Sequence, residues 1–558
     1  MVVSDRLKDP SRMYRLPSRY GVYATCLVGS IICLLAMALS PGWLAGIGLL
    51  AFGLPAALGT HDIVQRQHTV SRNYPILAHL RYWLESIGPE IRQYFIQPDT
   101  EERPYSREQR SLVYRRAKNT IDKQPFGSQR DMQAPGYEWM NHSLAPASIQ
   151  GHDFRVEIGA HRPRPYSASV FNISAMSFGA LSANAIRALN EGARDGGFYH
   201  DTGEGGLSPY HHQGGDLVWE IGSGYFGCRD SEGRFDPEQF TKTAQLEAVK
   251  MIEIKLSQGA KPGHGGVLPG PKVTPEIAST RGVPEGQDVL SPAAHSAFTT
   301  PREMIAFIQQ LRELSGGKPV GIKLAIGHPW EWFAMVKAMR EADDYPDFVV
   351  VDGGQGGTGA APLEFANRLG MPLTEALILV HNTLVGAGLR DDIRVGAAGK
   401  IISAFDIART MALGADWCNA ARGYMFALGC IQAQSCHTDR CPSGVATQDP
   451  RRGKRLDVPL KAERVRHFHG NTLKALAEML AASGLSHPSE LGPEHVVRRI
   501  SRHEVRSLAT LFDFVPPGAL LENGATHHPI FSDYWDQADP ASFAPPFSEW
   551  QLRQSKLV

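Results

Sequence analysis

The middle half of this chain alternates short apolar runs with segments of helix-like periodicity, and this limits the possible folds more than any other feature. Strands that alternate with helices in this way build a parallel sheet of β/α units. Eight strands within about 250 residues match a closed barrel of eight such units. We therefore predict an α/β fold, a (β/α)8 TIM barrel, with strands that begin near Phe171, Phe198, Met251, Asp288, Val320, Phe348, Ile393 and Asp416.

The loops after the predicted strands carry the polar chemistry. In such a barrel the active site lies at the carboxyl ends of the strands, and a phosphate group is held by backbone N–H groups after strands 7 and 8. Glycine-rich or charged sequences occur at these places: MSFG, TGEGG, QGAKPGHGG, SPAAH, DGGQGGTG and AAGK. Because turns also need glycine, one such loop alone is weak evidence. The candidates after strands 6, 7 and 8 are Gly353, Gly354, Gly356, Gly357, Gly396, Gly399, Lys400, Ala420, Ala421 and Arg422.

Three of the seven cysteines lie close together in the sequence, at Cys430, Cys436 and Cys441. Thiolates are soft ligands that suit iron–sulfur clusters or zinc. Three thiolates fit a [3Fe-4S] cluster, or a [4Fe-4S] cluster with one open iron, and His437 is available as a fourth ligand for zinc. The alternatives are three buried free thiols or a disulfide.

Two uncharged segments near the N-terminus, Gly21 to Leu39 and Trp43 to Leu58, flank the turn residues Ser40-Pro41-Gly42. A membrane-crossing helix needs about 20 apolar residues, with a range of about 17 to 25, so the first segment qualifies and the second is marginal. A signal peptide has an apolar core of only about 7–15 residues and fits this doubled pattern poorly. We predict a transmembrane helical hairpin that anchors the protein.

Positive charge on both sides of this hairpin predicts its orientation. Cytoplasmic flanks carry an excess of Lys and Arg, and the turn between the segments carries none. Both ends, and with them the catalytic body, are therefore expected in the cytoplasm, at the inner or cytoplasmic membrane. The flanking basic residues are Arg6, Lys8, Arg12, Arg15, Arg19, Arg66, Arg72 and Arg81.

We expect four regions: a membrane anchor at 1–60, an N-terminal linker and helical region at 61–165, the barrel with its cysteine loop at 166–475, and a C-terminal extension at 476–558. The segment that begins at Tyr74 has helical periodicity, interrupted at Gly88-Pro89, and is either an interfacial helix or a helix packed on the body. Lys+Arg and Asp+Glu are equal at 57 each. This balance argues against nucleic acid as a partner, because phosphate binding needs clustered positive charge.

The cysteine loop resembles that of glutamate synthases, in which a Cys-x5-Cys-x4-Cys run leads into CP-x-GVATQ. Here Cys441 opens CPSGVATQDP. Further stretches agree in order: ISAMSFGALS from Ile173, TGEGG from Thr202, IKLSQGAKPGHGGVLPGPKV from Ile254 and VDGGQGGTGAAP from Val351. The resemblance covers about Phe171 to Gln448, and the chain looks like the stand-alone, membrane-linked bacterial form of the family's FMN-binding domain.

The resemblance implies two cofactors, FMN and a [3Fe-4S] cluster, the latter on Cys430, Cys436 and Cys441. It implies that Glu204 and Lys261 are catalytic, and that Lys261 and Arg281 bind the substrate. The FMN contacts that it implies are Ser174, Met176, Ser177, Lys255, Gly353, Gly354, Gly399, Lys400, Ala420 and Ala421.

Two positions depart from the family pattern. Val267 stands where the family has a glutamine that contacts 2-oxoglutarate, and His264 stands where it has an acid. Loss of a polar contact should weaken or retune binding of the oxo acid, whereas Arg281 still indicates an anionic substrate. His264 and His295 are either acid–base groups or ordinary hydrogen-bonded loop residues.

The function implied is that of a glutamate synthase-like oxidoreductase, of the class acting on CH–NH2 donors. It would reductively aminate a 2-oxo acid, 2-oxoglutarate or a related substrate, with ammonia or an amine. The chain begins Met1-Val2-Val3 without the family's glutaminase cysteine, and no second dinucleotide fingerprint is evident. We therefore expect an external electron donor, a ferredoxin-like protein or a reductase. The alternative is a membrane-tethered flavin and iron–sulfur electron-transfer module without aminating activity.

Overall fold

The computed structural model describes residues 18–101, 103–521 and 528–545. The chain divides into two compact units, Met1–Pro104 and Tyr105–Val558. The first unit is helical throughout its regular structure. Its elements are η2 Ser18–Tyr20, α1 Gly21–Leu39, α2 Trp43–Val64, α3 Thr69–Asn73, α4 Leu77–Ile91 and the π turn η3 Arg92–Ile96.

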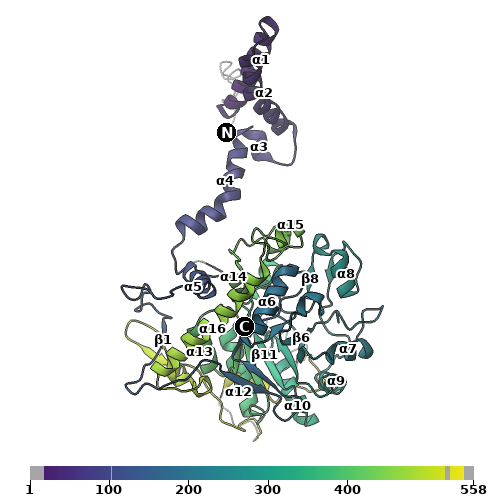
Figure 1. The fold of residues 1–558 in the computed structure, drawn as a ribbon, viewed down its shortest axis with the longest axis vertical. Coiled ribbons are helices and arrows are strands. Elements are labelled where there is room, and N and C mark those ends of the chain that lie inside the picture. The colour runs from purple at the N-terminus through teal and green to yellow at the C-terminus, as the bar shows by residue number, and fades with distance from the viewer. Residues whose placement is uncertain (1–17, 102, 522–527, 546–558) are drawn as a thin grey trace, which may run out of the picture. The chain divides into compact units, whose positions relative to one another are not determined.

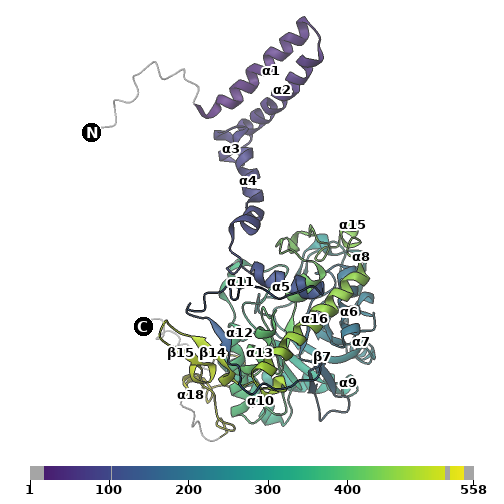
Figure 2. The ribbon, with the colours of Figure 1, turned by 60° about the vertical axis from the view of Figure 1, so that its left-hand side comes forward.

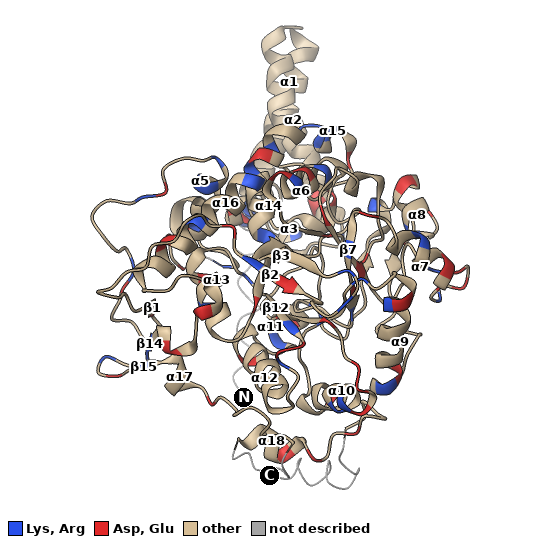
Figure 3. Cartoon of the chain, turned by 60° about the horizontal axis from the view of Figure 1, so that its bottom comes forward, with Lys and Arg blue, Asp and Glu red and all other residues tan. Residues whose placement is uncertain are grey.

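Two of the described helices, α1 and α2, are long and apolar enough to cross a membrane. Charged residues are absent from α1 (Figure 3). Glycines let the two helices approach closely, since a Cβ on Gly29 would lie 2.7 Å from the ring of Phe52. The second uncharged segment was marginal for a span, but α2 continues to Val64 and reaches 22 residues, which is long enough.

The helix predicted from Tyr74 forms as α4, but it is not interrupted at Gly88 and Pro89. Proline lacks an N–H and clashes with the preceding turn. Here the helix runs through Pro89 and continues into the π turn η3. Leu80, Trp83 and other apolar side chains of α4 are exposed.

The second unit is built on a closed barrel of eight parallel strands, in which the last strand pairs with the first. This confirms the predicted α/β barrel. Each strand is short, and almost every residue in it is buried, as expected where both faces of a sheet are covered. The strands are β4 Phe171–Ile173, β5 His200–Asp201, β6 Leu217–Ile221, β7 Val249–Lys255, β10 Val320–Leu324, β11 Phe348–Asp352, β12 Arg394–Ala398 and β13 Trp417–Ala420.

One predicted strand was wrong, and one barrel strand was missed. The run near Asp288 forms β9 Val289–Leu290, which pairs with β8 Val267–Leu268 as a small antiparallel hairpin outside the barrel. The missed strand is β6, whose LVWEI sequence is broken by Glu220. That glutamate is buried inside the barrel, so the strand lacks the continuous apolar run by which buried strands are found.

Helices cover the outside of the barrel. Several of their N-termini are capped by side chains, for example by Thr300 and Glu303 in a capping box at α9. The longest helix, α16, is the predicted helix after the cysteine loop, and it lies along α6 (Figure 1, Figure 2). The helices are α6 Ala183–Gly196, α7 Pro237–Ala244, α8 Pro275–Arg281, α9 Pro301–Leu314, α10 Pro329–Ala342, α11 Leu363–Arg368, α12 Leu373–Gly386, α13 Ala404–Ala412, α14 Arg422–Leu428, α15 Pro450–Gly453 and α16 Val458–Ala482.

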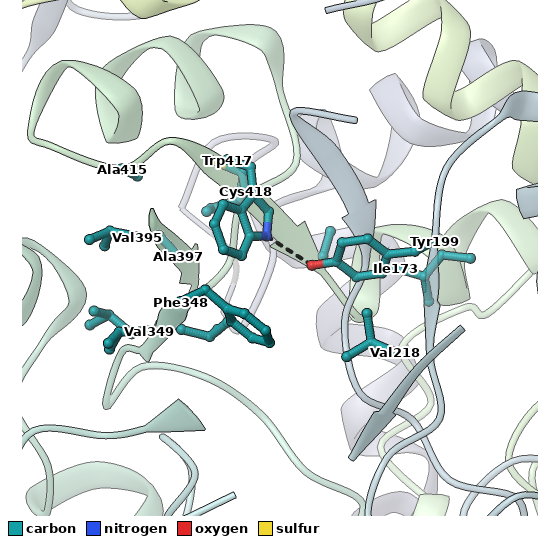
Figure 4. Packing of buried hydrophobic residues seen from close by; sticks show 14 of the residues in the cluster. Ile173, Tyr199, Val218, Phe348, Val349, Val395, Ala397, Ala415, Trp417 and Cys418 are labelled. Atoms are coloured by element: carbon teal, nitrogen blue, oxygen red, sulfur yellow. Dashed lines mark hydrogen bonds between the residues drawn. The ribbon is translucent and has the colours of Figure 1, made fainter. Parts of the chain in front are cut away.

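Large aromatic side chains fill the lower part of the barrel interior, which is the end where the strands begin; Phe348 and Trp417 are the first residues of β11 and β13 (Figure 4). The indole Nε1 of Trp417 donates a hydrogen bond of 2.8 Å to the Tyr199 hydroxyl. Glycines in the neighbouring strands make room for these rings. A Cβ on Gly321 would lie 2.4 Å from the Phe348 ring, and one on Gly396 would lie 2.5 Å from Trp417.

Segments before and after the barrel pack on its outside. A three-stranded antiparallel sheet, in the order β1-β14-β15, joins residues near 140 to residues near 500. In the C-terminal part Phe531 stacks on Phe333 of α10 at 5.1 Å between ring centroids. The elements are α5 Arg107–Ala117, β1 Glu138–Met140, β2 Arg155–Ile158, β3 Tyr166–Ser169, η4 Pro209–His211, η5 Gly270–Lys272, η6 Cys436–Thr438, η7 Pro488–Glu490, η8 Pro493–His495, β14 Val496–Arg499, β15 Val505–Ser507, α17 Leu508–Leu511 and α18 Pro529–Tyr534.

Candidate active site

A cavity of about 190 Å³ opens at the carboxyl ends of the barrel strands. Its wall is formed by loops that are far apart in the sequence and meet because parallel strands end at one face of the barrel. The sequence-predicted residues that line it are Ser174, Met176, Ser177, Glu204, Lys255, Lys261, Arg281, Gly399, Lys400, Ala420, Ala421 and Cys436.

Glu204, Lys255 and Arg281 lie on one side of this cavity. The Lys255 ammonium is 3.0 Å from the Glu204 carboxylate. Arg281 ends α8 and donates to the Phe178 carbonyl at 3.1 Å and to the Ser177 hydroxyl at 3.3 Å. A Cβ on Gly266 would lie 2.1 Å from a Glu204 oxygen, so a side chain there would push the carboxylate from its place. The glycines of both motifs therefore bring the lysine-bearing loop against the glutamate.

Burial and charge set the protonation of this group. Burial would raise the pKa of Glu204, but Lys255, Arg281 and Lys261 together hold that pKa below its usual value, so the carboxylate is ionised. Burial lowers the pKa of Lys261, and it lowers the pKa of Arg281 to about 10. The side therefore carries one buried anion among three cations.

One donor on this side is not used within the protein. Nε of Arg281 is buried and has no hydrogen-bond partner among the described residues. Buried polar groups are almost always paired, and an unpaired one calls for a missing water, ion or ligand. With its side chain 5% exposed and lining the cavity, Arg281 is suited to bind an anion there.

A second basic group lies after β12 and β13. Gly399 has φ of 153° and Lys400 has φ of 60°, a left-handed conformation that non-glycine residues seldom adopt outside functional sites. Arg422 donates to the Thr358 carbonyl at 2.8 Å and stands against Gly357. Tyr105, from before the barrel, lines the same part of the cavity. The arrangement offers cations and close backbone approach, as a phosphate requires.

The predicted glycines after β11 divide into two pairs. Gly356 and Gly357 line the cavity, whereas Gly353 and Gly354 are not among its lining residues. The N–H of Gly353 donates to Ala398 and that of Gly354 to Met371, each at 2.8 Å. These two N–H groups hold the loop in place, and their contact with FMN stays a prediction.

The loop that carries the three clustered cysteines reaches the cavity. Cys430 and Cys441 are buried, while Cys436 is half-buried and lines the cavity. Burial raises the pKa of Cys430 to about 11, and the neighbouring Cys436 and Cys441 raise it as well. Burial also opposes ionisation of Cys441, but its hydrogen bonds, first from Ser443, bring that pKa below its usual value. All three thiols are free, which excludes a disulfide among them in this structure.

The geometry of the thiols argues against a single zinc ion. Ligands at about 2.3 Å from one tetrahedral zinc lie within about 4 Å of one another. Among the described residues, the three cysteines do not form a set whose ligand atoms all lie within 4.8 Å. The three thiols stay candidate ligands of an iron–sulfur cluster, since soft thiolates are the ligands that such clusters use.

Lys272 and several charged residues were not predicted as site residues. The Lys272 ammonium donates to the carbonyl of Ala180 at 3.1 Å and to that of Cys436 at 3.3 Å, and so joins the cavity wall to the cysteine loop. It lies at the end of the KPGHGGVLPGPKV stretch, so position in the motif was the available signal. Glu220, Lys323 and Asp352 also line the cavity from inside the barrel.

The two histidines of uncertain role are both engaged in the protein and do not line the cavity. His295 lies 3.0 Å from the Tyr225 hydroxyl and 2.9 Å from the Lys255 carbonyl, and burial lowers its pKa to about 4. Its ring is therefore neutral and holds the loop that carries Lys255. His264 lies 3.0 Å from the Gly265 carbonyl and packs on Phe365.

Comparisons with known proteins show the family of this chain. The conserved region of glutamate synthase is matched over residues 140–486. The glutamate synthase large subunit-like protein YerD of Bacillus subtilis is 38% identical over 500 residues, which cover 82% of this chain and 95% of that protein. This chain belongs to the glutamate synthase family, and it is an oxidoreductase of the glutamate synthase type.

Two other relatives extend beyond the part of their sequence that this chain matches. The archaeal glutamate synthase [NADPH] of Methanocaldococcus jannaschii is 37% identical over 316 residues, which cover 56% of this chain and 59% of that protein. The archaeal-type glutamate synthase [NADPH] of Thermotoga maritima is 36% identical over 334 residues, with 59% and 62% covered. The chain thus spans about three fifths of the length of these two relatives.

The flavin-binding domain of baker's yeast flavocytochrome b2, a solved structure, aligns at 10% identity with a TM-score of 0.40, over 75% of this chain and 85% of that one. A likeness of this degree carries no argument about the site.

Proposed function

We propose that this protein binds FMN and reductively aminates a 2-oxo acid with ammonia or an amine, as an enzyme of the class acting on CH–NH2 donors. The observation that carries the proposal is one cavity in which Glu204, Lys255, Lys261 and Arg281 converge. The family membership supports a flavin, a 2-oxo acid and an electron donor in general terms.

The residues present fit FMN. Its phosphate would be held by Gly399, Lys400 and Arg422, where cations and a left-handed backbone lie together. The remaining contacts would come from Ser174, Met176, Ser177, Lys255, Ala420 and Ala421. Bound FMN would supply the hydride, and the protein would supply positioning and electrostatics.

The substrate would lie beside the cationic group. Arg281 would hold its carboxylate through the unpaired Nε, since charge-assisted hydrogen bonds are stronger than neutral ones. Lys261, which is 3% exposed, would polarise the carbonyl or imine and donate a proton to it. The ionised Glu204 would keep Lys255 charged and in place at 3.0 Å.

Electrons would enter through a [3Fe-4S] cluster on Cys430, Cys436 and Cys441. Contact of Cys436 with the cavity supports this path, because the cluster would then stand next to the flavin. The donor would be a ferredoxin-like protein or a reductase. The helices α1 and α2 would anchor the chain in the cytoplasmic membrane, with the barrel in the cytoplasm.

The identity of the oxo acid depends on the wall near Val267. Val267 and Leu268 are apolar and line the cavity in the hairpin β8–β9. An apolar wall makes no hydrogen bond to a second carboxylate, which weakens binding of 2-oxoglutarate relative to a pocket that has one. We propose 2-oxoglutarate or a related oxo acid as the substrate.

The test uses full-length protein purified anaerobically in detergent. Flavin and iron are measured first, in the wild type and in the matched variants Cys436→Ser and Cys228→Ser. We expect loss of the cluster signal only in Cys436→Ser, because Cys228 is buried away from the other thiols. A normal cluster in Cys436→Ser would refute the ligand assignment.

The second part of the test concerns substrate. Protein reduced by a chemical reductant is mixed with an oxo acid, with ammonium, or with both. We expect fastest reoxidation with both, since the imine accepts the hydride, and we expect Val267→Gln to lower the concentration of 2-oxoglutarate required. Reoxidation that ignores every oxo acid and amine, yet is rapid with an electron-carrier protein, would support the electron-transfer module instead.

A further inference from the structure

A set of charged side chains lies inside the barrel, below the cavity, and the proposed chemistry does not yet use it. It consists of Asp201 on β5, Glu220 on β6, Glu253 on β7 and Lys323 on β10, each between 1% and 4% exposed. Oxygens of the three carboxyl groups all lie within 4.8 Å of one another. We call these four residues the interior charge cluster.

The cluster holds more acids than bases. The Lys323 ammonium forms an ion pair with Glu220 and lies 3.4 Å from Oε1 of Glu253. Oε1 of Glu253 accepts no hydrogen bond from the described residues. One ammonium cannot neutralise three buried carboxylates, and an unpaired buried charge is very costly. At least one of the acids therefore carries a proton near neutral pH.

The directions of the pKa shifts agree with this count. Burial, together with the charge of Glu220, raises the pKa of Asp201 to about 7. Burial, with Asp201, raises the pKa of Glu253 well above its usual value. The other titratable groups that face the cluster are Tyr199 just before β5, Lys255 on β7 and Asp352 on β11, and burial raises the pKa of Asp352 as well.

The cluster is open to the cavity on one side. Glu220, Lys323 and Asp352 line the cavity, while Asp201 and Glu253 are not among its lining residues. Because oxygens of Asp201 and Glu253 lie within 4.8 Å of an oxygen of Glu220, Glu220 is the acid of the three that joins the other two to the cavity. The Lys323 ammonium lies against two of the three carboxylates and supplies positive charge there.

We propose that Asp201 and Glu253 share a stored proton, and that Glu220 passes it to the reaction in the cavity. The use of the proton rests on the proposed function, but its presence does not. Reductive amination converts one 2-oxo acid, one ammonium ion, two electrons and two protons into one amino acid and one water. An external one-electron carrier brings electrons without protons, so the protons need a separate source.

The transfer balances as follows. The O–H bond of the Glu253 carboxylic acid breaks, and its proton moves to a carboxylate oxygen of Glu220. The same proton then leaves Glu220 for the group that is being reduced in the cavity, and solvent later returns a proton to Glu253. Lys323 stays charged throughout and stabilises the ionised forms of both glutamates. Glu253 touches neither substrate nor cofactor, so it acts only through Glu220.

The presence of the proton is tested by infrared spectroscopy of the full-length protein in detergent between pH 5 and 9. Ordinary carboxyl groups ionise near pH 4. We expect a C=O band of a protonated carboxylic acid that persists above pH 6, shifts in D2O, and disappears in Glu253→Gln or Asp201→Asn. The matched control Glu247→Gln, at an exposed glutamate, should leave the band unchanged.

Three results would overturn the stored proton. They are absence of the band in the wild type above pH 6, its persistence unchanged in both variants, or its loss on addition of Mg²⁺ or Mn²⁺, which would make the cluster a metal site. Because the wild-type spectrum is decisive by itself, a variant that fails to fold does not leave the question open.

The use of the proton is tested by steady-state kinetics. Glu253→Gln should lower kcat about 10²-fold, as expected for loss of a proton donor, and should leave KM for the oxo acid within about twofold. A raised KM with unchanged kcat would contradict this role. If the wild type shows no turnover with any oxo acid and amine, the proposed function fails while the infrared result still stands.

Discussion

Two layers of the same barrel interior differ completely in chemistry, although both are buried. The lower layer contains Tyr199, Phe348 and Trp417, packed against one another (Figure 4). The layer above it is the interior charge cluster. Side chains two positions apart in extended chain point to the same face, so Tyr199, which directly precedes β5, and Asp201 on β5 both point inward, one in each layer. The barrel interior therefore accommodates both aromatic and charged side chains.

The contrast between the aromatic layer and the charged layer separates what closure of the barrel requires from what it does not require. Closing the barrel requires only that its interior be filled, and the aromatic layer does this with rings and opposing glycines. Charged groups fill the same volume but lose their hydration. Apolar residues of similar volume would fill the upper layer at least as well, so its charges point to chemistry and not to stability.

The largest effect is expected from Trp417→Ala. Loss of a fully buried indole leaves a cavity and removes the hydrogen bond to Tyr199, so the free energy of unfolding should fall by about 3–5 kcal/mol. Urea denaturation followed by circular dichroism measures it, with Leu363→Ala at an exposed site as the control. A change below 1 kcal/mol, roughly that of a surface substitution, would mean that the lower layer is not the packed core.

A somewhat smaller loss is expected from Lys323→Met, about 3 kcal/mol near neutral pH. Removal of the ammonium leaves Glu220 and Glu253 without a counter-charge in the interior. The double variant Lys323→Met/Glu220→Gln should recover much of the loss, and denaturation of both variants at one pH measures this. Equal losses in the single and double variants would show that packing, not charge, accounts for the effect.

At the mouth of the barrel, Arg281→Ala should weaken substrate binding by about 1.5–3 kcal/mol. The residue lines the cavity and has an unpaired buried donor, so its loss should raise KM for the oxo acid. Steady-state kinetics measures this change, and Arg234→Ala, at an exposed arginine on a loop outside the cavity, serves as the control. An unchanged KM would move the carboxylate site elsewhere.

The last expected effect is a pH dependence that Asp201 adds to stability, and it is the smallest when counted per pH unit. Its pKa is about 7 in the folded protein and near 3.8 when unfolded, so the folded state binds more protons between these values. Its contribution to the free energy of unfolding therefore falls as pH rises from 4 to 7, by at most about 1.4 kcal/mol per pH unit. Asp201→Asn should remove this slope, which denaturation at several pH values compares with the wild type.

Most of the cavity could be predicted from the sequence, because the sequence motifs lie in the loops that the fold brings together. Glu204, Lys255 and Lys261 stand in glycine-rich stretches after strands, and parallel strands bring such stretches to one face whatever the details of packing. The one strand that was missed, β6, is the strand with Glu220 in it. A buried charge interrupts the apolar run on which strand prediction depends. Glu220 is therefore the reason that β6 was not predicted.

The sequence by itself determined the barrel, the pair of uncharged N-terminal segments and the set of loops that form the cavity, because periodicity and composition act locally. Only the tertiary structure decided which charges meet. Asp201, Glu220, Glu253 and Lys323 come from four strands spread over more than a hundred residues, and nothing near any of them in the chain predicts the others. Closure of the barrel and the register of its strands place them in one layer, and burial there, absent from any local sequence, fixes their protonation.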